Sequence, residues 1–209
     1  MNTSRPKHRK PVSARPASAR ERIDQTAYEL FSRHGIRAVG VDTVVAHSGV
    51  AKMTLYRHYP SKDKLALAFL RRREALWTRA WLQEEVERRA RKPGERLLMV
   101  FDAFDKWFRR PDFEACSFAK ALLEQSDPRH PVRHAAVRHI ETLHALLKQW
   151  AEDASARDSD RIARQWLILM TGAIIAAYAG DLDAAKRARE VGTLLLAREG
   201  VAIGRTVRA

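Results

Sequence analysis

The 209-residue sequence contains a single cysteine, Cys116, so no disulfide can form within the chain and a zinc site built on cysteines is disfavoured. This cysteine usage fits a reducing cytoplasm, which is where we expect the protein to act. The sequence also lacks a long apolar run, because its longest, Leu167 to Gly180, spans 14 residues and is interrupted by Thr171. A bilayer span needs about 20 such residues, so we expect a buried helix there and no membrane partner.

The usual catalytic signatures are absent. The sequence has no G-x-S-x-G, no phosphate-binding P-loop and no H-E-x-x-H, and we expect neither an enzyme nor a cofactor. His130 and His134 are four residues apart, as a metal-binding pair on a helix would be. However, Pro131 suits the first position of a helix and would leave His130 outside it, so we expect no metal site.

Acidic residues are scarce, and the shortage is uneven. The chain has 39 Lys and Arg against 25 Asp and Glu, a net charge of +14. Residues 1–64 hold 13 basic and 5 acidic residues, whereas residues 65–209 hold 26 and 20. The excess near the N-terminus indicates a polyanionic partner, although a generally arginine-rich protein is an alternative.

Residues 1–17 carry five basic residues, three prolines and no acid, a composition typical of a disordered arm. Such an arm either contacts DNA or is a passive terminus.

From about residue 18 the apolar residues follow helical spacing, and no segment shows the alternation of a strand. The first predicted helix carries Ile23, Ala27, Leu30 and Phe31 on one face and ends at His34-Gly35. The fourth is capped near Ser61 and should stop near Pro93-Gly94. The fold class is therefore all-α, with further helices expected around 41–48, 51–59, 97–110, 118–123, 131–154, 159–178 and 181–198.

Residues 35–65 have the pattern of a helix-turn-helix, whose second helix enters the major groove of DNA. Gly49 occupies the turn, where a positive φ is needed. A small core is expected from Val44, Val45, Val50 and Leu55. The predicted exposed side chains of the recognition helix are Lys52, Met53, Thr54, Tyr56, Arg57 and His58, and Lys62 and Lys64 begin the next helix, where phosphates bind.

This segment resembles the DNA-binding domain of the TetR/AcrR family of bacterial transcriptional regulators over about residues 20–68. The matching elements are Phe31…Gly35, Val45-Ala46, Ser48-Gly49-Val50-Ala51, Leu55-Tyr56-Arg57-His58-Tyr59 and Ser61-Lys62-Asp63-Lys64-Leu65. The resemblance implies that Thr43 and Lys62 contact phosphate, that Thr54 and Tyr56 contact backbone or bases, and that His58 faces backbone. Gly40, Ala51 and Met53 depart from the family pattern, the first two at helix caps and the third on the groove-facing helix.

The resemblance also implies a domain order: a basic arm (1–17), a three-helix DNA-binding domain (18–65) and a C-terminal helical bundle (66–209) for ligand binding and dimerisation. Aromatic residues of the middle helices are the pocket candidates: Phe101, Phe104, Trp107, Phe108, Phe118, Trp166 and Tyr178. Ordinary core packing would explain the same residues. Small and apolar residues of the last two helices are the candidates for the dimer interface: Ala173, Ala176, Ala177, Ala184, Ala188, Val191 and Leu195.

The sequence thus predicts a homodimeric, ligand-responsive repressor. Its expected partners are a palindromic operator in double-stranded DNA, a second copy of itself and an unidentified small-molecule effector. The alternative is a non-specific, nucleoid-type DNA-binding protein held on DNA by charge.

Overall fold

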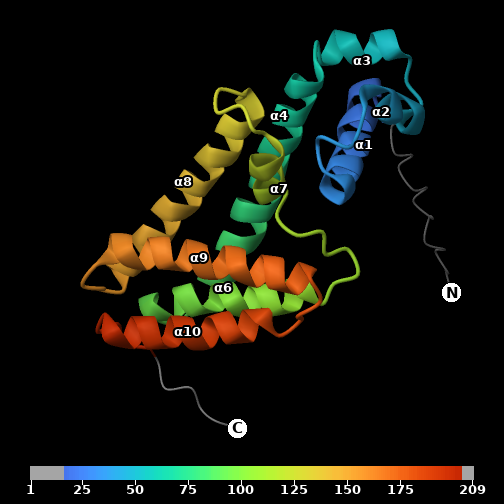
Figure 1. The fold of residues 1–209 in the computed structure, drawn as a ribbon. Coiled ribbons are helices and arrows are strands. Elements are labelled where there is room, and N and C mark those ends of the chain that lie inside the picture. The colour runs from blue at the N-terminus through green and yellow to red at the C-terminus, as the bar shows by residue number, and fades with distance from the viewer. Residues whose placement is uncertain (1–16, 204–209) are drawn as a thin grey trace, which may run out of the picture.

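The computed structural model describes residues 17–203, and every regular element in that range is a helix (Figure 1), which confirms the all-α prediction. Residues 1–16, which include nearly all of the predicted arm, lie outside the described range. The elements are α1 (Ala19–His34), α2 (Val41–Ser48), α3 (Lys52–His58), α4 (Lys62–Arg73), a π-helix η1 (Glu74–Gln83), α5 (Glu84–Arg89), α6 (Pro93–Phe108), α7 (Ser117–Glu124), α8 (Pro131–Asp153), α9 (Ser159–Tyr178) and α10 (Ala184–Arg198).

Local sequence signals set most helix ends. Ser18 caps α1, because its Oγ accepts from the Glu21 amide at 3.2 Å while the Glu21 carboxylate accepts from the Ser18 amide at 2.7 Å. Gly35, with φ 85°, ends this helix. Pro131 begins α8, and Asp158 caps α9 by accepting from Arg161 N at 3.0 Å.

One unbroken helical rod runs from residue 62 to residue 89 and consists of α4, η1 and α5. It begins at the predicted cap, Ser61, and passes through the expected domain boundary at residue 65. It ends four residues before Pro93 and is π-helical in its middle, which apolar spacing did not predict. The rod therefore belongs to both domains.

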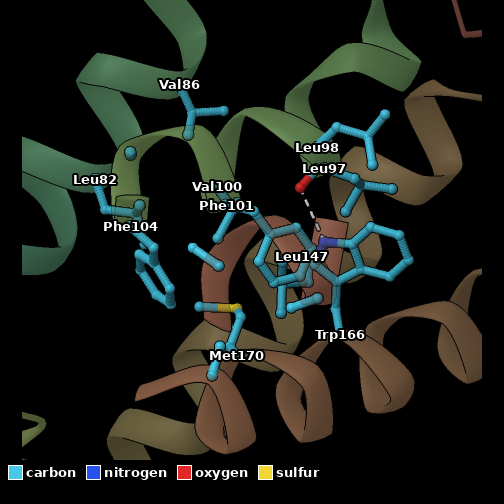
Figure 2. Packing of buried hydrophobic residues seen from close by; sticks show 14 of the residues in the cluster. Leu82, Val86, Leu97, Leu98, Val100, Phe101, Phe104, Leu147, Trp166 and Met170 are labelled. Carbon is cyan, nitrogen blue, oxygen red and sulfur yellow. Dashed lines mark hydrogen bonds between the residues drawn. The ribbon is translucent and has the colours of Figure 1, made fainter. Parts of the chain in front are cut away.

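Two clusters of buried side chains form the core. The C-terminal cluster lies among α6, α8, α9 and α10, where the indole of Trp166 is fully buried and donates to the Leu97 carbonyl at 2.9 Å (Figure 2). The N-terminal cluster joins α1–α4 and continues into the other domain through Phe118 of α7 and Ala136 of α8. Helices α1–α4 are thus packed against the C-terminal domain.

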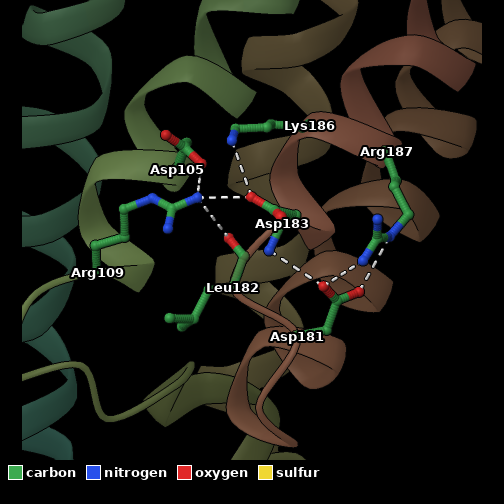
Figure 3. Close-up of polar contacts among 7 residues, drawn as sticks. All are labelled: Asp105, Arg109, Asp181, Leu182, Asp183, Lys186 and Arg187. Atoms are coloured by element: carbon green, nitrogen blue, oxygen red, sulfur yellow. Dashed lines mark hydrogen bonds and ion pairs between the residues drawn. The ribbon is translucent and has the colours of Figure 1, made fainter.

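Polar contacts fix the corner between α9 and α10, next to the end of α6 (Figure 3). The Arg109 guanidinium donates to Asp105 at 3.0 Å, to the Leu182 carbonyl at 3.3 Å and to Asp183 at 2.7 Å. The helix α10 begins at Ala184, a few residues later than expected, because Gly180 (φ 108°) and the following residues form this corner. The corner holds α9 and α10 side by side.

Candidate nucleic-acid interface

The helix-turn-helix consists of α2, a turn at Gly49 and α3 at one end of the molecule (Figure 1). Gly49 has φ 64° and ψ 27°, and its amide donates to the Val45 carbonyl at 3.2 Å. A side chain in this left-handed conformation would be strained, which explains the glycine. Val44 and Leu55 are fully buried beneath the turn and fix the angle between the two helices.

The side chains predicted to contact DNA lie mostly on the outer surface of α2 and α3. Met53 is 68% exposed and Tyr56 38% exposed, whereas Tyr59 is buried, as expected for a core residue. Thr43, Lys52, Arg57 and His58 are also exposed, and Thr54 is half-buried. The structure therefore brings these residues together around the recognition helix, with Met53 and Tyr56 as its large projecting side chains.

Two of the predicted cations have protein partners. The Lys52 ammonium lies 2.7 Å from an Asp42 carboxylate oxygen, and this hydrogen bond raises the pKa of Lys52. The Lys62 ammonium donates to the Arg37 carbonyl at 3.2 Å, and partial burial lowers its pKa. The first contact sets the orientation of Lys52 at the start of α3, and the second places Lys62 at the junction with the α1–α2 loop.

The departures at Gly40 and Ala51 have a structural consequence. Both residues are helix N-caps in extended conformation, and neither provides a side-chain hydrogen bond. Helices α2 and α3 therefore begin without the usual side-chain cap. Arg22 of α1 provides another constraint, since its Nε donates to the Ser48 carbonyl at 3.2 Å near the end of α2.

Residues of α7 also position the interface, and sequence reasoning missed them. The Glu124 carboxylate accepts from the Arg37 amide at 3.0 Å, and the Lys120 ammonium donates to the Ser32 carbonyl at 3.1 Å. These contacts join the C-terminal domain to the end of α1 and the loop that follows it. Their partners are more than eighty residues apart in the chain, so no local pattern indicates them.

Comparisons with known proteins agree with this architecture. Residues 23–69 match the family model described as bacterial regulatory proteins, tetR family. The whole fold is similar to a TetR-family transcriptional regulator from Streptomyces coelicolor, with 27% identity, a TM-score of 0.81 and coverage of 88% of this chain and 91% of that one. A putative TetR transcriptional regulator from Streptomyces avermitilis is similar at 29% identity and a TM-score of 0.79, over 89% of this chain and 100% of that one. Residues 23–69 thus match the TetR family, and the overall fold is that of TetR-family regulators.

Similarity to curated transcriptional regulators covers about a third of the chain. The putative mycofactocin biosynthesis transcriptional regulator MftR of Mycobacterium tuberculosis is 36% identical over 58 residues, which are 28% of this chain. The chain spans 29% of the length of that relative.

The aromatic residues predicted to line a ligand pocket are mostly packed in the core. Phe101, Phe104, Phe108 and Trp166 are at most 2% exposed in the C-terminal cluster, and Phe118 is stacked on His139 with the ring centroids 3.5 Å apart. Tyr178, in contrast, is 59% exposed. Of the seven, Trp107 lines an open cleft. The structure therefore separates these residues among core, surface and cleft instead of gathering them around one cavity.

The residues predicted for the dimer interface differ in how exposed they are. Four alanines on α9 and α10 are buried inside the protomer and expose little surface: Ala173, Ala177, Ala184 and Ala188. Val191 is 45% exposed, and Ala176 and Leu195 are half-buried. The exposed apolar side chains of α9 are others, Ile168 and Ile175.

Within residues 17–203, no three His, Cys, Asp or Glu side chains come close enough together to hold a metal ion. No helix of that range is long and apolar enough to cross a membrane.

Proposed function

We propose that this chain is a TetR-family repressor that binds a palindromic operator as a homodimer in the cytoplasm and responds to a small-molecule effector. The observation that carries the proposal is the recognition helix: α3 projects Met53 and Tyr56 from a fixed helix-turn-helix in the most basic part of the chain. Side chains in this position read base edges, while neighbouring cations and hydroxyls bind phosphates.

An exposed apolar surface on the two C-terminal helices supports dimerisation. Ile168 and Ile175 lie two turns apart on α9 and are 72% and 51% exposed, and Leu194 on α10 is 72% exposed. Helices α9 and α10 pack against each other, so these side chains can form one continuous patch. Large exposed apolar patches mark association sites, and a self-complementary patch gives a two-fold dimer.

The dimer is tested by placing a charge in this patch. Ile168→Glu and Leu194→Glu should each convert a dimer into a monomer, because an unpaired carboxylate would be buried at the interface. Leu123→Glu is the matched control, since Leu123 is 81% exposed but lies on α7. Light scattering after size-exclusion chromatography measures the mass, and a monomeric wild-type protein would contradict the proposal.

Operator binding is tested by selecting bound sequences from random DNA with the full chain. We expect two inverted half-sites at a fixed separation, because two recognition helices at a fixed distance read two segments of the groove. Tyr56→Ala should weaken operator binding by about five- to a hundredfold and binding to random DNA much less.

A non-specific, nucleoid-type protein is the second candidate, favoured by the net charge of +14. Both candidates predict affinity that falls steeply with salt. They differ in the selection experiment, where a nucleoid-type protein would enrich no sequence and would bind operator and random DNA alike.

A further inference from the structure

An open cleft separates α1 of the DNA-binding domain from η1, the end of α6 and the loop that follows α6. Its volume is about 680 Å³, within the range of pockets that hold small organic molecules. The DNA-binding domain supplies Tyr28, Ser32 and Arg33, and the C-terminal domain supplies Trp107 and Glu114. The cleft is therefore built by both domains, and its wall borders the packed aromatic core, to which Trp107 belongs.

Three indoles make one wall of the cleft. The ring centroid of Trp77 lies 5.3 Å from that of Trp81 and 5.2 Å from that of Trp107, and the latter two are 5.9 Å apart. Trp77 and Trp81 are only partly buried, although they are large apolar side chains. Such a cluster offers a broad apolar surface on which an aromatic ring can stack or pack edge-on.

Two buried side-chain groups of residues that line the cleft lack a hydrogen-bond partner, and both can donate. The Nε1 of Trp77 and the Oγ of Ser32 are buried, and neither has a hydrogen-bond partner among the described residues. A buried donor without a partner is costly, so such groups commonly mark a missing ligand or water.

The cleft is lined by three arginines and three carboxylates, Glu29 among them, and one of the arginines has no ion-pair partner in the described part of the chain. Arg110 and Arg33 have carboxylate partners, Asp112 at 2.7 Å and Glu114 at 3.8 Å. Arg73 donates to the neutral Tyr28 hydroxyl at 3.0 Å, and no carboxylate of residues 17–203 forms an ion pair with it. Arg73 is also the residue one turn before Trp77 on the rod. A guanidinium without a carboxylate partner, beside an aromatic wall, matches a carboxylate attached to a ring.

The backbone is unusual on two sides of the cleft. Trp77 and Trp81 lie in the π-helix η1, and π-turns occur frequently at functional sites. Ala115, which follows the lining residue Glu114, has φ 61°, a left-handed conformation that is costly for a residue with a Cβ. Both features lie where the cleft is formed.

We infer that this cleft is an effector site for an aromatic carboxylate. The ligand would contact α1 and the C-terminal domain together, so its affinity depends on how the two domains are oriented. A ligand with different affinities for two orientations shifts the population between them and thereby moves the recognition helix. This inference identifies the effector class and site, and its effect on DNA rests on the proposed function.

Calorimetric titration of the full chain with three probes that share one ring system tests the charge preference. The probes are naphthoate, the neutral naphthylmethanol and the cationic naphthylmethylammonium. We expect naphthoate to bind at least about tenfold more tightly than either analogue, since a charge-assisted hydrogen bond corresponds to about that factor or more. Equal binding of the three, preference for the cation, or no binding of naphthoate would overturn the inference.

Substitutions then test the location. Arg73→Gln should weaken naphthoate binding about ten- to a hundredfold and leave naphthylmethanol binding nearly unchanged, and Arg73→Lys should restore part of the loss. Arg71→Gln is the control, because Arg71 lies two residues away on the same helix and does not line the cleft. Equal effects of Arg73→Gln and Arg71→Gln would contradict the assignment. Melting temperatures verify that each variant is folded.

Operator affinity distinguishes failure of the site from failure of the proposed function. If naphthoate binds in an Arg73-dependent manner and leaves operator affinity unchanged, the site stands and the proposed effector response fails. If another compound releases the operator equally from wild type and Arg73→Gln, the response stands and the cleft assignment fails. Loss of operator affinity with naphthoate in wild type but not in Arg73→Gln would support both.

Discussion

His139 on α8 should make the stability of this protein strongly dependent on pH. The side chain is 1% exposed, is stacked on Phe118 of α7, and has no hydrogen-bond partner for either nitrogen among the described residues. Burial alone lowers its pKa from 6.5 to about 4. The imidazole is therefore neutral in the folded protein at neutral pH, because a buried imidazolium would be neither solvated nor paired.

The sign and size of the effect follow from the two pKa values. Below pH 6.5 the unfolded chain binds a proton at this histidine that the folded chain does not, so stability falls as the pH falls. The loss continues until about pH 4, where the folded state binds the proton as well. Between these two pKa values the free energy of unfolding falls by about 1.4 kcal/mol for each pH unit, which gives a total loss of roughly 3 kcal/mol. Between pH 7.5 and pH 5 the loss is about 2 kcal/mol.

Urea denaturation of wild type and His139→Phe at pH 7.5 and pH 5 measures this loss. The variant keeps an aromatic ring against Phe118 and removes the titrating group, so its stability should fall by about 2 kcal/mol less than that of wild type. The difference between the two pH dependences cancels any constant packing effect of the substitution. His58→Gln, at an exposed histidine of α3, should behave like wild type. Equal pH dependence in wild type and His139→Phe would refute the reasoning.

Three further outcomes concern packing and helix ends. Gly192→Ala should destabilise the protein by about 1–3 kcal/mol in thermal or urea denaturation, because its Cβ would lie 2.9 Å from the Trp166 ring; an unchanged stability would show that the ring can move aside. Ser61→Ala should lower the free energy of unfolding by about 1 kcal/mol, since the Ser61 hydroxyl accepts from the Lys64 amide at the start of α4. Ala51→Ser should instead raise the free energy of unfolding by up to about 1 kcal/mol, because Ala51 is an N-cap in extended conformation that lacks a side-chain hydrogen bond. A loss of stability in Ala51→Ser would contradict the capping argument.

Much of the DNA-binding end could be predicted from the sequence because its signals are local. The glycine at the turn, the burial of Val44 and Leu55, and the cap at Ser61 each depend on residues a few positions apart. The same holds for the exposure of Tyr56 and the burial of Tyr59, which follow from helical spacing within one short segment.

The rest depends on contacts between distant segments. The contact between Glu124 and the Arg37 amide joins residues 87 positions apart, and the cleft requires α1, η1 and α6 to meet. Helices α9 and α10 show a second reason why the sequence does not predict every contact. Each carries apolar residues on more than one face, and spacing alone does not tell which face is used inside the protomer. Ala173 and Ala184 were predicted at the interface and are buried within the protomer, whereas Ile168 is exposed.

The helical rod of residues 62–89 has a consequence for how such a regulator can diverge. Its π-helical stretch, residues 74–83, follows the part of the rod that packs in the N-terminal cluster, and its own Leu82 lies in the C-terminal cluster. A π-turn closes its hydrogen bonds one residue later than an α-turn, so the stretch is equivalent to an α-helix with residues inserted. Because each α-helical residue advances the chain by roughly 100° about the axis, deleting one residue there turns one end of the rod relative to the other while the helix remains continuous. Single insertions and deletions in this stretch can therefore adjust the angle at which the protein presents its recognition helices, and they would also shift Trp77 and Trp81 in the wall of the cleft.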